Sequence, residues 1–122
     1  MRYMLLIYGD ETAWAAGAPE DMAAQMQLWN DYTAWLQGKG WMLHGEALEP
    51  TASATTVRAP EGAPMTVDGP FAETKEQLGG YYAIECANLD EAIEAASRIP
   101  SVASGGSVEI RPITEFPDEP EA

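Results

Sequence analysis

The residues best suited to chemistry lie in one segment in the middle of the chain, from Asp68 to Gly80. Asp68 stands before a Gly-Pro pair, and proline both lacks a backbone N–H and pushes the preceding residue out of the helical region. A sharp turn is therefore predicted, with a carboxylate at its corner. In a pocket, Asp68 would act as a general base or accept hydrogen bonds from a ligand. The alternative is that the carboxylate caps the turn by accepting bonds from backbone N–H groups.

The same segment carries further charged and aromatic side chains. Glu73 and Lys75 are two residues apart. As a functional pair, Lys75 would hold an anionic substrate while Glu73 moves a proton. As a structural pair, they would form exposed ion pairs that fix the loop, as we expect for Glu76, and such pairs contribute little. Phe71 is the aromatic residue best placed to line a pocket, because it belongs to this loop.

Two further candidates lie outside this segment. His44 is the single histidine, and its unperturbed pKa is near neutrality. It shares a predicted strand face with Met42, Glu46 and Leu48, and no sequence neighbour orients it, so an ordinary hydrogen-bonded role is favoured over a catalytic one. Arg111 either faces a pocket or pairs with Glu109. The candidate bases are therefore Asp68 and His44, and the candidate ligand contacts are Phe71, Glu73, Lys75 and Arg111.

Composition excludes several classes of function. The 122 residues include 6 basic and 20 acidic ones, for a net charge of −14, so binding to nucleic acid or to an anionic membrane would be repulsive.

One cysteine, Cys86, allows no internal disulfide and no cysteine-cluster metal site, and we expect it to be a buried, inert thiol. No metal-ligand spacing or phosphate-binding glycine loop is present, so neither metal nor cofactor is predicted. Without a signal peptide or an apolar span, the expected location is cytoplasmic.

Hydrophobic periodicity predicts alternating strands and helices. Residues 1–8 are apolar with little alternation, which is typical of a central strand covered on both faces. The first predicted elements are a strand at 1–8, a loop or short helical turn at 11–18, a helix from Pro19 to Gly38 and a strand at 41–48. They are followed by a hairpin of 54–58 with 65–67 and a strand restarting at Gly79-Gly80. The last elements are a helix capped by Asn88 and Glu91 and stopped by Pro100, and a strand at 107–113.

This order predicts an α+β fold of the ferredoxin-like βαββαβ type with an extra hairpin. The domain is expected to span residues 1–114, followed by an acidic, proline-containing tail at 115–122 that is solvated or loosely attached. Two helices can cover only one face of such a sheet. A second copy of the chain is the expected cover for the other face, which predicts a homodimer.

The sequence also resembles a known family. The run from Asp68 to Glu76, followed by Gly79-Gly80-Tyr81-Tyr82, is similar to the signature of the DGPF branch of the YCII-related proteins. The aliphatic first strand, Gly45-Glu46-Ala47-Leu48, and Val108-Glu109-Ile110-Arg111-Pro112 agree with it. The resemblance implies a ferredoxin-like subunit of the dimeric α+β barrel superfamily, in which two sheets pack and enclose pockets. Most members of the branch have no assigned activity, and some are associated with extracytoplasmic-function sigma factors.

One departure from the wider family limits what the resemblance implies. Related YCII proteins resemble enzymes with a His–Asp pair whose histidine lies at the first helix, and this chain has no histidine there. The first hypothesis is therefore a protein that binds a small, anionic organic molecule, with a regulatory role and a sigma-factor link implied by the resemblance alone. The second is an enzyme for proton transfer, such as lactone isomerisation or dehalogenation, with Asp68 or His44 as the base. The third is a docking module whose acidic surface meets a basic partner.

Overall fold

The computed structural model describes residues 1–15 and 19–117 of the chain. Its helices and strands are β1 (Arg2–Gly9), α1 (Glu11–Ala15), α2 (Pro19–Gly38), β2 (Met42–Ala47), the 3-10 turn η1 (Thr51–Ser53), β3 (Thr55–Arg58), β4 (Met65–Asp68), β5 (Gln77–Glu85), α3 (Leu89–Ser97), α4 (Pro100–Ala103) and β6 (Ser107–Pro112). A four-stranded antiparallel sheet has the order β2-β5-β1-β6, and β3 and β4 form a separate hairpin. The predicted ferredoxin-like α+β fold is confirmed.

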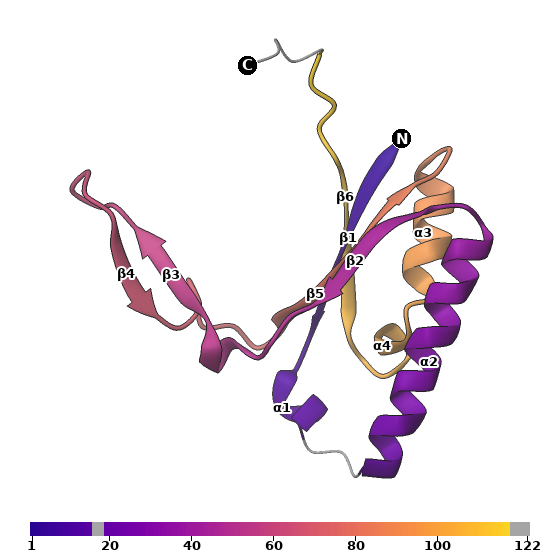
Figure 1. Ribbon diagram of the computed structural model, residues 1–122, viewed down its shortest axis with the longest axis horizontal. Helices are drawn as coiled ribbons and strands as arrows, with labels where there is room; N and C mark the ends of the chain where they lie inside the picture. The colour runs from indigo at the N-terminus through magenta and orange to yellow at the C-terminus, as the bar shows by residue number, and fades with distance from the viewer. Residues whose placement is uncertain (16–18, 118–122) are drawn as a thin grey trace.

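The helices cover one face of the four-stranded sheet (Figure 1). On β1, Tyr3, Leu5 and Ile7 are buried toward the helices, whereas Met4 and Leu6 between them stay half-exposed. The prediction of a central strand is right, because β1 lies between β5 and β6. The prediction that both of its faces are covered is wrong for the single chain, in which the described helices occupy one side only.

The core joins the sheet to α2 and α3. Its fully buried large side chains are Leu5, Leu36, Ile84 and Ile99. Tyr32 on α2 donates a buried hydrogen bond of 2.7 Å to the carbonyl oxygen of Ala95 on α3, which ties the two helices together. The apolar face predicted for α2 is wider than its contact with the sheet, because Met22, Met26 and Leu28 are exposed.

The predicted Asn88 cap of α3 is confirmed, whereas the reciprocal bond of Glu91 goes to Ala87 instead of the cap residue. The Asn88 side chain accepts a 3.0 Å bond from the Glu91 N–H, and the Glu91 carboxylate accepts a 2.7 Å bond from the Ala87 N–H. The predicted end of the helix is wrong: α3 stops at Ser97, and Pro100 is the first residue of α4. Ile99 takes an extended conformation, as a residue before proline prefers.

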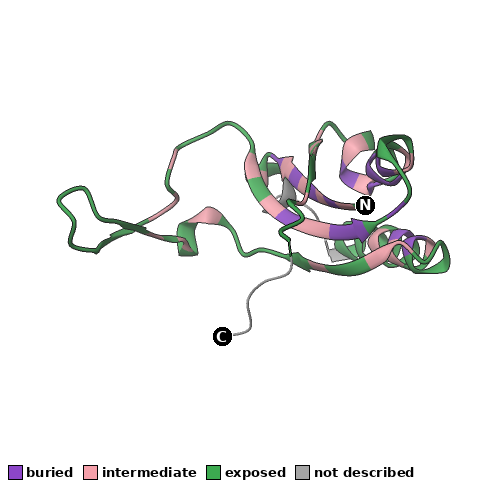
Figure 2. Ribbon diagram, turned by 90° about the horizontal axis from the view of Figure 1, so that it is seen from above, coloured by how far each residue is buried: buried purple, intermediate pink, exposed green. Residues whose placement is uncertain are grey.

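The strand after the Asp68 segment begins earlier than predicted. β5 starts at Gln77 instead of Gly79, because Gln77 still pairs with Gly9 at the end of β1. The hairpin of β3 and β4, which the sequence predicted, extends away from the rest of the molecule in both views (Figures 1 and 2). We call residues 54–71 the arm.

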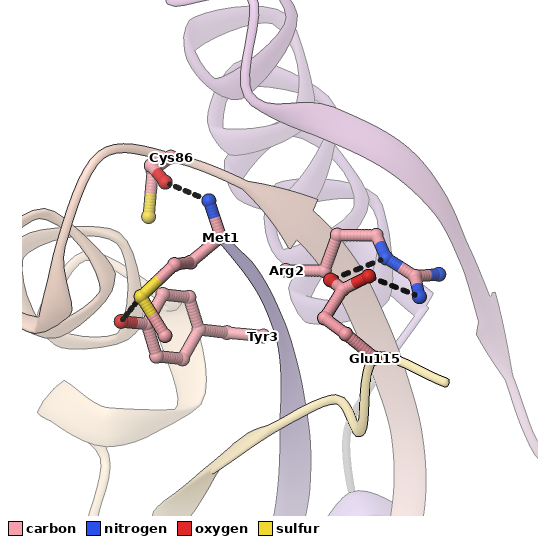
Figure 3. Close-up of polar contacts among 5 residues, drawn as sticks. All are labelled: Met1, Arg2, Tyr3, Cys86 and Glu115. Carbon is pink, nitrogen blue, oxygen red and sulfur yellow. Dashed lines mark hydrogen bonds and ion pairs between the residues drawn. The ribbon is translucent and has the colours of Figure 1, made fainter. Parts of the chain in front are cut away.

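Both ends of the described chain are fastened to neighbouring strands (Figure 3). The N-terminal amino group donates a 2.8 Å bond to the Cys86 carbonyl oxygen, and the Arg2 guanidinium forms an ion pair of 3.2 Å with Glu115. The first residue of the predicted loose tail is therefore held against β1, and residues 118–122 of that tail lie outside the described residues. Cys86 itself is buried, as predicted, and burial raises the pKa of its thiol.

Candidate functional site

The sheet has one face that no described element of the chain covers. The register of the strands shows which side chains point away from the helices, since directly paired residues lie on the same side of a sheet. We call this side the uncovered face. Its residues are Arg2, Met4, Leu6 and Tyr8 of β1, Leu78, Tyr81, Ala83 and Glu85 of β5, His44 and Glu46 of β2, and Ser107, Glu109 and Arg111 of β6.

Two transverse rows cross the uncovered face. One row runs Arg111, Met4, Ala83, His44, and the next runs Glu109, Leu6, Tyr81, Glu46. Because adjacent strands are about 4.8 Å apart, each row is about 14 Å wide. The centre of the face is therefore apolar. Each row ends, on β6 and on β2, in a titratable or charged side chain.

His44 reaches this face through a bulge in β2. Met42 pairs with Ile84 and His44 with the next residue, Ala83, so Leu43 is the extra residue and the side-chain alternation shifts there. The prediction that His44 shares a face with Met42 is therefore wrong, whereas its sharing of a face with Glu46 is confirmed. A bulge of this kind redirects a side chain without a strong sequence signal.

On the uncovered face, His44 has an aromatic partner. Its Nδ1 lies 3.2 Å from the Tyr81 hydroxyl, and the two rings meet edge to face with centroids 5.6 Å apart. His44 remains exposed, and Tyr81 is half-buried. The Tyr81 hydroxyl holds the Nδ1 atom of His44, and the hydrogen bonds of the described residues include none to Nε2.

Arg111 shares the uncovered face with Glu109, as the alternation of β6 predicted. The predicted ion pair between them does not form, since the salt bridges found in residues 1–15 and 19–117 join Arg2 to Glu115 and Arg98 to Glu94. The Arg111 guanidinium is therefore an exposed positive charge on a strongly acidic chain.

Asp68 lies at the end of β4, where it is exposed and pairs with Thr55. The turn that follows it is held by other groups. Gly69 adopts a φ of 102°, its N–H donates a 2.7 Å bond to the Ala54 carbonyl oxygen, and its own carbonyl accepts a 2.8 Å bond from the Thr56 hydroxyl. Among the hydrogen bonds of the described residues, none involves the Asp68 carboxylate, so the turn is formed without the cap that the sequence allowed.

The rest of the segment is also open to solvent. Phe71 is 77% exposed, and its carbonyl oxygen accepts a 3.1 Å bond from the Arg58 guanidinium. Glu73 and Lys75 are exposed, and the part of the chain that the structure describes shows no ion pair for either of them. Glu76 accepts a 3.3 Å bond from the Ser107 hydroxyl, so the end of the segment lies beside β6.

The predicted residues therefore separate into two groups. His44 and Arg111 lie on opposite borders of the uncovered face, in the same row. Asp68 and Phe71 lie on the arm, which points away from the sheet (Figure 2). Glu73 and Lys75 lie on the connection between the arm and β5. Two shallow hollows lie on the helix side and are lined by residues such as Trp35 with Arg98 and Ile93 with Val108, and none of the predicted site residues lines them.

Sequence reasoning missed a polar network at the base of the arm. The Glu11 carboxylate accepts bonds from the Thr51 N–H, at 3.0 Å, and from the Thr51 hydroxyl. The Glu11 N–H donates a 3.1 Å bond to the Gln77 side chain, which donates in turn to the Thr74 carbonyl oxygen. These residues are distant in sequence, and nothing local to Glu11 marked it out.

Across the described ranges, no three His, Cys, Asp or Glu side chains are grouped so that they could hold a metal ion. None of the helices in those ranges is both long and apolar enough to cross a membrane.

The fold and the strand register define an α+β protein of ferredoxin-like type that carries an inserted hairpin and one uncovered sheet face. The chain belongs to the YCII-related domain family, which it matches over residues 1–117. It is also 39% identical over 117 residues to an uncharacterised protein of Rhizobium meliloti (strain 1021), with 95% of this chain and 94% of that protein covered.

Proposed function

We propose that this protein binds a small organic anion against its uncovered face, and that it does so as a homodimer. The observation that carries the proposal is the composition of that face. Its centre is apolar, with Leu6 flanked by Tyr81, and its borders hold the His44–Tyr81 hydrogen bond and the unpaired Arg111. An apolar surface that carries a small number of polar groups is the usual make-up of a small-molecule site.

The charge of the chain supports an anionic ligand. At a net charge of −14, the field of the protein repels anions, and a bare guanidinium on an apolar surface is the feature that offsets this repulsion locally. Arg111 is such a group. A guanidinium also matches a carboxylate geometrically, because it can donate two parallel hydrogen bonds.

The openness of the face supports the dimer. A single sheet surface does not enclose a ligand, whereas small-molecule sites bury most of the ligand surface. A second copy of the chain would close the site and would also remove Met4, Leu6 and Tyr8 from water. The homodimer is therefore proposed on the same ground as in the sequence analysis, namely that two helices cover only one face of the sheet.

Binding is favoured over proton-transfer catalysis because neither candidate base lies in an enclosed site of the described chain. His44 and Asp68 are both exposed, and neither lines the hollows on the helix side. A general base must lie within hydrogen-bond reach of the proton that it removes, in a site that also orients the substrate. A regulatory role, read out as ligand-dependent association with a sigma factor, rests on the family resemblance alone.

A thermal-shift screen against small carboxylates, lactones and aromatic metabolites tests the proposal. A compound at a hundredfold its dissociation constant should stabilise the protein by about 2.7 kcal/mol. The shift should disappear in Arg111→Gln and be partly kept in Arg111→Lys, which retains the charge without the bidentate geometry. If no compound shifts the melting temperature, or if Arg111→Gln responds like the parent, the proposal fails. The first of these outcomes favours docking to a basic protein partner.

A further inference from the structure

The arm has an exposed apolar surface with no core of its own. Val57 is 64% exposed, Met65 49% and Val67 45%, and every residue of β4 is exposed. An isolated two-stranded hairpin is at best marginally stable in water, and it gains stability when one of its faces packs against something else. The arm therefore needs a covering surface.

The body of the same chain does not supply that surface. The side-chain hydrogen bonds within the arm, from Thr56 to Gly69 and from Arg58 to Phe71, join arm residues to each other. The contact that fastens its base to the body is the pair of bonds between Thr51 and Glu11. Both views show the hairpin pointing away from the sheet (Figures 1 and 2).

One face of the arm matches the uncovered face in chemistry and in size. The pairing of Thr56 with Val67 and of Arg58 with Met65 puts these four residues on one side of the hairpin, and Val57 and Asp68 on the other. Apart from the Thr56 hydroxyl, the first side is apolar with one cation, and Arg58 has no carboxylate partner among the salt bridges of residues 1–15 and 19–117. Strands of four residues extend about 13 Å, close to the width of about 14 Å of the uncovered face.

The uncovered face offers the complementary pattern. Its centre holds Met4 and Leu6, and the row through Leu6 ends in a carboxylate at each border, Glu46 on β2 and Glu109 on β6. An apolar strip between two acids suits a hairpin that presents two apolar side chains and an arginine. In a dimer with two-fold symmetry, each copy would supply one arm and receive the other, so both contacts form together.

We propose that the arm of one copy lies along the uncovered face of a second copy through Arg58, Met65 and Val67, so that Phe71 of one chain completes a site whose His44 and Arg111 belong to the other. This inference rests on the homodimer of the proposed function. It adds which of the two chains supplies each side chain of the site. It accounts for a phenyl ring that is 77% exposed, because the partners of that ring lie on the second chain. It also brings Phe71 to the face that carries His44 and Arg111, which one chain keeps apart.

Cross-linking between two copies of different size tests whether each copy places its arm on the other. With the single cysteine removed by Cys86→Ala, one copy carries Val67→Cys on the arm, and a second copy, enlarged by a fusion tag, carries Tyr8→Cys on the uncovered face. The mixed copies are treated with a short bis-maleimide. The expected product is a cross-link between chains of different size. The matched control replaces Val67→Cys by Asp21→Cys, an exposed residue of the helix layer, and should give little of that product.

Two results would overturn the inference. One is a dimer that gives no cross-link beyond the Asp21→Cys control, which means that the sheets meet without the arms. The other comes from a chain that carries both Val67→Cys and Tyr8→Cys: a cross-link confined to single chains means that the arm folds over its own sheet. The result is independent of any ligand, so a failed thermal-shift screen with a positive cross-link removes the proposed binding function and leaves the arm exchange standing.

A second measurement covers the case in which the cysteine variants do not fold. Arg58→Glu reverses the cation of the arm, and Glu61→Lys at the exposed hairpin tip is a charge-reversal control. Sedimentation analysis should show that Arg58→Glu raises the dimer dissociation constant by at least about tenfold, which corresponds to about 1.4 kcal/mol. Glu61→Lys should leave the constant within about threefold of the parent, since rim charges contribute little to affinity. Equal constants for the parent and Arg58→Glu would reject the contact.

Discussion

Glu11 binds Thr51 through both of its carboxylate oxygens, one accepting from the Thr51 backbone N–H and the other from the Thr51 hydroxyl. The contact joins α1, which follows β1, to η1, which precedes the arm. The Glu11 N–H also bonds to Gln77 at the start of β5. Three segments that are distant in sequence therefore meet at Glu11, and this junction sets how the arm leaves the body.

Replacing Glu11 by alanine should loosen that junction. Thr51 would lose the acceptors of both its bonds, and hydrogen bonds to a charged group contribute about 1.5–3 kcal/mol each when well formed. Because Glu11 is half-exposed, we expect a smaller total loss, of about 1–2 kcal/mol. Urea unfolding measures the loss, and hydrogen exchange should become faster in residues 51–71.

The control for Glu11→Ala is Glu20→Ala. Glu20 is an exposed first-turn acid of α2, and the described hydrogen bonds include none to its carboxylate. Its replacement should change stability by less than about 0.5 kcal/mol. If the two variants unfold at the same urea concentration, Glu11 does not support the arm.

Gly80 should not tolerate a side chain. It is buried in β5, and a Cβ atom there would lie 2.8 Å from the Glu46 carbonyl oxygen of the neighbouring strand. Since backbone must move to relieve this contact, Gly80→Ala should cost about 1–3 kcal/mol. Gly38→Ala is the control, because its Cβ would meet nothing within 4 Å and alanine is the better helix former. Equal melting temperatures for the two variants would contradict the close approach of β2 and β5.

The raised pKa of Tyr32 should make the free energy of unfolding fall at alkaline pH. Burial raises the pKa of its hydroxyl, which donates to the Ala95 carbonyl oxygen. In the unfolded chain a tyrosine loses its proton near pH 10, whereas the folded protein retains the Tyr32 proton. Above about pH 10 the unfolded state therefore binds fewer protons, and stability falls by up to about 1.4 kcal/mol per pH unit.

The variant Tyr32→Phe separates this effect from the hydrogen bond. At about pH 8 it should be less stable than the parent by about 1–2 kcal/mol, because the Ala95 carbonyl oxygen loses its donor. Between about pH 10 and pH 11 it should lose stability less steeply than the parent. Urea unfolding across this range provides the comparison, and parallel curves for the two proteins would show that Tyr32 does not cause the alkaline decline.

The sequence was sufficient for the fold because each element carried its own local signal. Asn88 and Glu91 marked the start of α3, the turn residues between β3 and β4 marked the hairpin, and the alternation in β6 separated Val108 from Arg111. These signals depend on residues that are close in sequence, which is why they could be recognised without the tertiary structure.

The arrangement of the site was harder to predict because it depends on long-range relationships. The bulge at Leu43 decides which face His44 occupies, and no local residue pattern announces it. The Glu11–Thr51 contact joins positions that are 40 residues apart. From the sequence, Pro100 predicts the end of a helix, although it begins the next one, because proline is common just after a helix and at its first position. The loop predicted after Asp68 is confirmed for residues 69–76, but the distance of Asp68 from Arg111 depends on the direction of the arm.

Asp68→Asn tests whether this carboxylate serves the turn or the ligand. No hydrogen bond to the Asp68 side chain is found within the described ranges, so the substitution should change stability by less than about 0.5 kcal/mol. Gly69→Ala is the contrasting variant, because its φ of 102° is strained for any residue with a side chain, and the change should cost about 1 kcal/mol or more. Thermal unfolding would show a normal Asp68→Asn and a destabilised Gly69→Ala. A large loss in Asp68→Asn would instead assign the carboxylate to the turn.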